Sequence, residues 1–268
     1  MPGKRLNKVP EVPGIAPGIM WVHSHITSDA LTPDVFTKWY EEVHIPDMMA
    51  TKGGPKTVLR YGWMESPSPK DMRYLTIYFL DDMGWLHFPG CELWGLPLHN
   101  EMLPGPSRFI GDFAHFDTRF YEEINTTVVE TAATHEVLQV VEPPPPPPAK
   151  YLASVTFDLD IDDDKLEQDQ IGQCLAHTAA APPLPFIRAT TYRLQPFPGG
   201  GGAMDTIEKQ QVEHRPKFLR LAQFVAQPTF TDNSTLAPPR AKNIQVEMFS
   251  LLKTFGTDGP DGFLKGNR

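Results

Sequence analysis

Six consecutive prolines at positions 143–148 constrain this chain more than any other feature of its sequence. Proline fixes φ and lacks a backbone N–H, so the run fits neither a helix nor a central strand and is typical of a stiff polyproline II spacer. It divides the 268 residues nearly in half. Because domains commonly hold roughly 100–200 residues, the sequence predicts two folded units.

The proline run and the composition around it predict five segments. The prolines at positions 2, 10, 13 and 17 indicate an extended N-terminal arm. The predicted segments are the arm (1–17), a first unit (18–142), the polyproline linker (143–150), a second and more degenerate unit (151–256) and a C-terminal tail (257–268).

Charge and cysteine content exclude several classes of protein. The net charge is -9, from 33 acidic and 24 basic residues, and the longest basic run is the pair Lys4 and Arg5, so we expect no nucleic-acid partner. Cys91 and Cys174 form no CxxC or CxxH pair, which argues against structural zinc or a disulfide framework. No apolar run reaches the roughly 18 residues of a membrane span, and no apolar segment typical of a secretory signal follows the N-terminus. We therefore expect a cytoplasmic protein with no membrane partner.

The first half alternates between strand and helix patterns. A strand is predicted at 18–26, followed by a helix that Thr32 caps and Pro33 opens, with Pro46 bending or ending it. Its apolar positions recur at helical spacing at Val35, Phe36, Trp39, Tyr40 and Val43. Strands at 57–64 and 74–80, a short helix at 92–102 and a strand at 109–121 complete a βαββαβ order.

The second half repeats this order in weaker form. The sequence predicts a strand at 151–159, a helix at 163–179 and strands at 186–194, 218–226 and 243–252. The second helix of this half has no clear counterpart. The matching order favours two degenerate copies of one α+β unit.

Residues 36–47 carry a resemblance to a known family. The segment Phe36-Thr37-Lys38-Trp39-Tyr40-Glu41-Glu42-Val43-His44-Ile45-Pro46-Asp47 resembles the helix motif of the EthD-like group of dimeric α/β-barrel proteins, in which it follows the first strand. The resemblance covers about residues 18–121. It implies two ferredoxin-like βαββαβ units that form an intramolecular pseudo-dimer resembling a dimeric α/β barrel, with the proline run between them. It also implies analogy to cofactor-free fungal decarboxylases acting on aromatic polyketide acids.

Strand alternation predicts which side chains line the barrel. On the first strand Met20, Val22 and Ile26 are expected to face helices, which turns Trp21, His23 and His25 inward. The same argument turns Leu75, Ile77 and Phe79 outward. The predicted pocket then has aromatic and polar walls from Trp21, Trp63, Tyr74, Tyr78, His23, His25, His115, Asp117 and Arg119.

Histidines are the expected acid and base groups, because imidazole titrates near neutral pH. The candidates are His23, His44 and His115, with Asp117 fixing a tautomer, and with Arg119 and Tyr78 stabilising an oxyanion. An inward histidine on such a strand is more often a hydrogen-bonded core residue than a catalyst, and His44 can equally be a helix cap that favours the dipole. Asp47 is a possible partner of His44.

The aromatic connection at 85–94 is a second candidate binding element. Trp85 and His87 lie in it, and long connections often act as lids or binding loops. A contact surface with another subunit, and hence a homodimer, is an equal alternative.

The leading hypothesis is a cofactor-independent lyase or isomerase that decarboxylates, dehydrates or cyclises a hydrophobic polyketide-like intermediate by proton transfer. No GxGxxG follows a strand, and no P-loop or GxSxG occurs, so no cofactor is expected. His23 and His25 lack a third metal ligand at diagnostic spacing, so we expect no metal. The alternatives are a non-catalytic binding or chaperone protein for such an intermediate and a haem- or metal-dependent oxidoreductase of the same barrel superfamily.

Overall fold

A computed structural model of the chain describes residues 16–68, 71–87, 91–128, 149–159, 186–196, 215–228, 236–237 and 241–256. The six prolines, the helix predicted at 163–179 and the predicted C-terminal tail lie outside the described residues, as do most of the predicted arm and linker.

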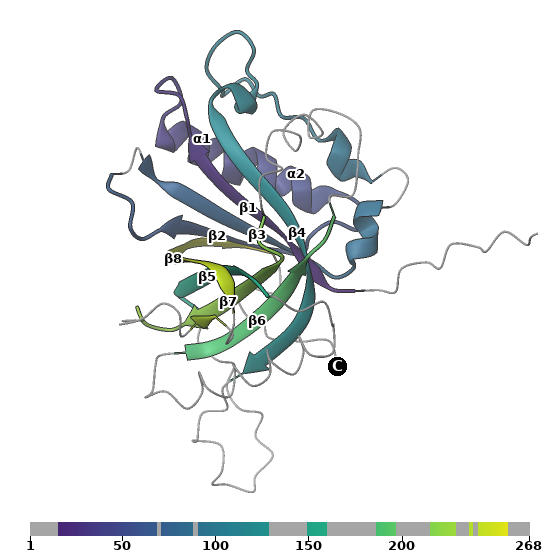
Figure 1. The fold of residues 1–268 in the computed structure, drawn as a ribbon. Helices are drawn as coiled ribbons and strands as arrows, with labels where there is room; N and C mark the ends of the chain where they lie inside the picture. The colour runs from purple at the N-terminus through teal and green to yellow at the C-terminus, as the bar shows by residue number, and fades with distance from the viewer. Residues whose placement is uncertain are drawn as a thin grey trace, which may run out of the picture.

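Eight antiparallel strands close into a barrel (Figure 1). They are β1 (Gly18–Ile26), β2 (Thr57–Trp63), β3 (Arg73–Leu80), β4 (Ala114–Val128), β5 (Tyr151–Asp158), β6 (Phe186–Leu194), β7 (Phe218–Phe224) and β8 (Lys242–Phe255). Around the barrel they follow the order β1-β3-β2-β8-β5-β7-β6-β4, and β4 pairs with β1 to close it. Closure gives each of the described strands a neighbour on both sides, so the sheet has no open edge strand.

Two strand pairings, which we call joints, connect the strands of the first half of the chain to those of the second half. Tyr61 of β2 lies opposite Leu251 of β8, and Tyr121 of β4 lies opposite Leu194 of β6. Both joints contain a register shift, and such bulges bend the strands around the barrel.

The helix predicted after the first strand is present, with an irregular middle. Thr32 Oγ1 accepts from the N–H of Val35 and caps α1 (Pro33–Trp39), which continues through a π-helical turn, η1 (Tyr40–His44), into α2 (Ile45–Ala50). Pro46 cannot donate to the carbonyl of Glu42, and its ring would clash there in an α-helix. The π-helical turn before it accommodates the proline without ending the helix.

The connection between β3 and β4 is formed by short 3-10 turns. These are η3 (Met83–His87), η4 (Glu92–Gly95) and η5 (Ile110–Asp112). The expectation of a helix at 92–102 was wrong, because Pro97 restricts Leu96 to extended backbone and ends the turn. In the part of the chain that the structure describes, no helix has the length and apolar character needed to cross a membrane.

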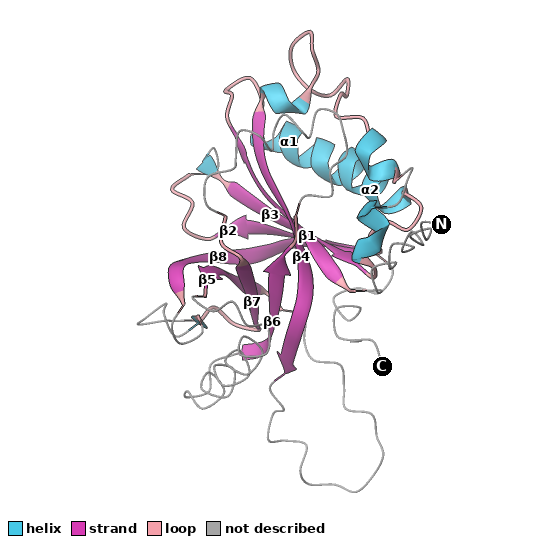
Figure 2. Cartoon of the chain, turned by 45° about the vertical axis from the view of Figure 1, so that its right-hand side comes forward, coloured by secondary structure: helices cyan, strands magenta, loops and turns pink. Residues whose placement is uncertain are grey.

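One cluster of buried side chains fills the inside of the barrel. It draws on all eight strands and on no helix: Ile19, Trp21, Leu59, Tyr61, Leu75, Ile77, Tyr121, Leu152, Tyr192, Leu219, Leu221 and Phe249. A second cluster lies between the outer face of the β4-β1-β3-β2 sheet and α1, η1 and α2, which cover that face (Figure 2). The helices therefore cover one side of the barrel and leave its inside to strand residues.

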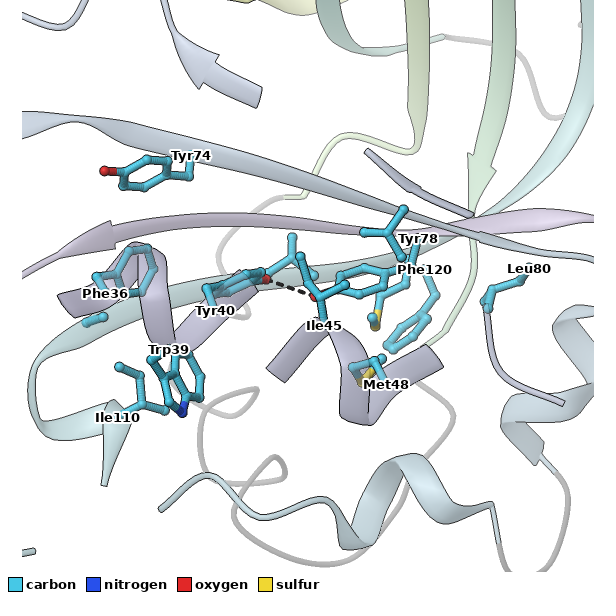
Figure 3. Packing of buried hydrophobic residues seen from close by; sticks show 14 of the residues in the cluster. Phe36, Trp39, Tyr40, Ile45, Met48, Tyr74, Tyr78, Leu80, Ile110 and Phe120 are labelled. Atoms are coloured by element: carbon cyan, nitrogen blue, oxygen red, sulfur yellow. Dashed lines mark hydrogen bonds between the residues drawn. The ribbon is translucent and has the colours of Figure 1, made fainter. Parts of the chain in front are cut away.

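The register of β3 corrects the predicted faces of that strand. Leu75 and Ile77 lie opposite His23 and Trp21 of β1, and directly paired residues share one face of a sheet. Leu75 and Ile77 therefore face the inside. The expectation that Tyr74, Thr76 and Tyr78 face the inside was wrong: both tyrosines pack under the helices (Figure 3), and Thr76 lies opposite Val22 on the same face.

Candidate functional site

Polar side chains gather inside one end of the barrel, where β1 and β4 run side by side. The paired positions are Trp21 with Arg119, His23 with Asp117, and His25 with His115. The strict alternation of both strands turns these six side chains to the inner face. We call this group the polar end.

Asp117 is bound by two arginines. The Nε of Arg119 donates to its Oδ2 at 2.9 Å, and a guanidinium nitrogen of Arg215 lies 3.6 Å from its Oδ1. The Arg119 guanidinium also lies over the Trp21 ring, 4.9 Å from the centroid. Asp117 therefore fixes two cations at the polar end.

His23 is the deepest histidine of the group and is only partly exposed. Desolvation lowers its pKa to about 4 against the opposing effect of Asp117, and Arg73, His25 and Arg119 add to the lowering. Its ring is therefore neutral at pH 7. Its Nε2 is buried and has no hydrogen-bond partner among the described residues.

His25 and His115 lie at the outer rim of the polar end. Their ring centroids are 5.2 Å apart. Burial, then His115 and Arg73, lower the pKa of His25. The side chain of His115 is exposed to solvent.

Strand β3, which is paired with β1, adds one cation to this end, and β8 adds one acid. Arg73 of β3 lies 4.7 Å over the Trp63 ring and 3.8 Å from a carboxylate oxygen of Glu247 on β8. Burial raises the pKa of Glu247, and the nearby arginines Arg73 and Arg119 oppose that rise. Both halves of the chain thus contribute charge to this end.

Several buried polar atoms on the inner face have no hydrogen-bond partner among the described residues. They include Trp21 Nε1, His23 Nε2, Tyr61 Oη, Trp63 Nε1, Ser154 Oγ and Thr156 Oγ1. A buried polar group without a partner costs about 1–3 kcal/mol, and native proteins retain few of them. A bound molecule with complementary polar groups would satisfy them.

Four of the predicted site residues lie on the other side of the sheet. His44 stacks on Trp39 at 5.0 Å within the helix layer, where burial lowers its pKa to about 4. Tyr78 and Tyr74 belong to the same layer. The Nε1 of Trp85 donates to the carbonyl of Lys52 at 2.8 Å, which anchors it there as well. The structure brings none of these four to the polar end.

His87, the remaining predicted residue, is exposed at the end of η3. Among the described residues, no three His, Cys, Asp or Glu side chains gather in a way that could hold a metal ion.

Sequence reasoning missed Arg73, Arg215 and Tyr61. Tyr61 carries a usable signal, since alternation along 57–63 puts it on the face of Trp63. Arg73 opens its strand, and Arg215 precedes one; only strand pairing and barrel closure bring them to Glu247 and Asp117.

No family model matches the chain, and no curated protein matches it. Among solved structures, a proposed monooxygenase from Fusobacterium nucleatum subsp. nucleatum is similar at 10% identity and a TM-score of 0.50, over 92% of this chain and 97% of that one. An anthrone oxidase-like protein is similar at 14% identity and a TM-score of 0.50, over 88% and 92%. At these identities the likeness shows the fold alone, and the chain shares the barrel fold of these two neighbours.

Proposed function

We propose that the chain is a cofactor-independent lyase or isomerase that moves a proton on a hydrophobic, polyketide-like molecule bound inside the polar end. One observation carries the proposal: the neutral His23 lies among buried, unpartnered donors and a fixed arginine. Small-molecule sites are mostly apolar with a few convergent polar groups, which fits this end of the barrel.

His23 is the proposed acid and base. Its neutral ring can accept a proton from a carbon next to a carbonyl and return it elsewhere on the substrate. An enolate that forms beside the ring raises the pKa of His23 as the proton moves, because the new opposite charges attract. A low starting pKa and a rise on transfer make the proton easy to return.

Arg119 is the proposed oxyanion partner. Asp117 and the Trp21 ring hold its guanidinium in place before any substrate binds. A donor fixed in advance stabilises developing negative charge without reorganising in the transition state. Trp21 and Trp63 supply aromatic walls for a flat substrate, and their indole N–H groups can donate to its oxygens.

We also propose that the barrel consists of two degenerate ferredoxin-like units. The strand order β4-β1-β3-β2 of the first half recurs as β8-β5-β7-β6 in the second, which supports this. Such a chain needs no second subunit to complete its barrel.

The test uses anthrone, a polyketide-like ketone whose methylene protons are acidic. Under argon in D2O, the protein should catalyse deuterium incorporation at that methylene, measured by mass spectrometry. His23→Gln should slow the exchange by about 10²-fold or more, the usual effect of losing a general base. His99→Gln, at an exposed histidine outside the barrel, is the matched control and should keep the wild-type rate.

Two results would replace the proposal. Conversion to anthraquinone that requires air, with no exchange under argon, would make the chain an oxygenase. Saturable binding of anthrone with neither reaction would make it a binding protein.

A further inference from the structure

We propose that Arg60 holds the carboxylate of an aromatic acid at a second site, in the layer between the sheet and the helices. This site lies on the opposite face of the sheet from the polar end. Arg60 sits on β2 opposite Thr76 and is 1% exposed.

Half of the Arg60 guanidinium is already bound. Its Nη1 donates to Glu41 Oε1 at 2.9 Å and approaches the carbonyl of Thr37 at 3.5 Å. Its Nε and Nη2 are buried and have no hydrogen-bond partner among the described residues. These two N–H groups point from the same edge of the guanidinium, which is the edge that binds a carboxylate through two parallel hydrogen bonds.

The local charge favours an added anion. Glu41 is shared between Arg60 and Lys253, whose Nζ lies 2.7 Å from Glu41 Oε2. Two cations therefore share one carboxylate, and of these two only Arg60 is buried, since the Lys253 side chain is half-exposed to water. A buried charge without full compensation is costly, and one carboxylate at the free edge would balance it.

The surroundings of Arg60 fit an aromatic body on that carboxylate. The rings of Phe36, Tyr40 and Tyr74 lie 5.6, 5.0 and 4.6 Å from the guanidinium carbon. Phe36, Tyr40 and Tyr74, which Figure 3 labels, belong to one buried cluster, and the ring centroids of Phe36 and Tyr74 lie 5.3 Å apart. Aromatic ligands pack well against such rings, whereas an inorganic anion would leave them unused.

Hydroxyl groups on the same face offer further polar contacts. Tyr78 Oη donates to Tyr40 Oη at 3.2 Å, and Ser24 Oγ is fully buried without a partner among the described residues. Tyr40 and Glu41, which both contact Arg60, lie in the π-helical turn η1. Such turns are rare and occur frequently at functional sites.

The first experiment is a crystal of the full chain soaked in 4-bromobenzoate. The anomalous signal of bromine locates the ligand, and the expected carboxylate lies within hydrogen-bond distance of Arg60 Nε and Nη2. Bromine at the polar end, near Arg73 or Arg119, would overturn the proposal. An ordered water at the free edge of Arg60 with no bromine would also overturn it.

The second experiment compares affinities in solution by calorimetry. Benzoate should bind at least about tenfold more tightly than benzamide, its uncharged analogue, because charge-assisted hydrogen bonds are the stronger kind. Arg60→Lys keeps the charge but not the paired donors, and should weaken benzoate binding about tenfold or more. His23→Gln should leave the affinity for benzoate unchanged. A failure of the Arg60 site is therefore distinguishable from a failure of the proposed function. Equal affinity for benzoate and benzamide would refute the site, even if Arg60→Lys does not fold.

Discussion

The neutral state of His23 makes the stability of the protein depend on pH in a predictable way. Its pKa is about 4 in the folded chain and 6.5 as an isolated group. Between these values the unfolded chain binds a proton that the folded chain does not, so stability rises with pH in this window. The contribution of neutral His23 to the stability of the fold is complete above pH 6.5 and is lost as the pH falls toward 4.

The magnitude follows from the size of the pKa shift. One pH unit corresponds to 1.36 kcal/mol, so lowering the pH from 7.5 to 5.5 should cost about 1.4 kcal/mol for His23 alone. His44, whose pKa burial also lowers to about 4, should cost a similar amount. His23→Gln removes one of these two terms, so the variant should lose about 1.4 kcal/mol less than the wild type over the same interval.

Urea unfolding followed by tryptophan fluorescence at pH 7.5 and 5.5 measures these differences. His99→Gln, at an exposed histidine, should behave like the wild type. In NMR spectra the His23 ring proton should not shift until the pH is below about 5. The reasoning is refuted if His23→Gln loses as much stability as the wild type, or if the His23 ring titrates near pH 6.5.

Two further predictions concern stability alone and are checked by urea unfolding at pH 7.5. Glu41→Gln should lower the free energy of unfolding by about 3–5 kcal/mol, because it leaves Arg60 buried without its anion. Lys253→Met, at a half-exposed partner of the same carboxylate, should lower it by at most about 1 kcal/mol. Equal losses for the two variants would contradict this reasoning. Ile77→Ala should lower the free energy of unfolding by about 2–5 kcal/mol, because it opens a cavity inside the barrel. Tyr78→Phe should lower it by about 1 kcal/mol, because it removes one hydrogen bond. A larger loss for Tyr78→Phe than for Ile77→Ala would be evidence against the faces assigned to β3.

Where a strand alternates clearly, the sequence was enough to assign its faces. On β1, Met20 and Val22 alternate with Trp21 and His23, and the structure places the first pair under the helices and the second inside the barrel. The bounds of β1 and β6 were also predicted to the residue. Short-range periodicity determines such features, because it depends only on neighbours along the chain.

For strand β3 the local sequence pattern does not determine which face points into the barrel. Tyr74, Leu75, Thr76, Ile77 and Tyr78 form a continuous run with apolar character on both faces, so alternation gives no reason to prefer either. The pairing of β3 with β1 decides which of its side chains face the inside of the barrel, because a register shift of one residue would exchange the two faces.

The candidate sites divide in the same way. His23, Asp117 and Arg119 could be named from the alternation of β1 and β4. The approach of Arg73 to Glu247, of Arg215 to Asp117 and of Lys253 to Glu41 joins residues far apart in the chain. Only closure of the barrel and packing of the helix layer fix those distances, because they depend on tertiary contacts that no local pattern encodes.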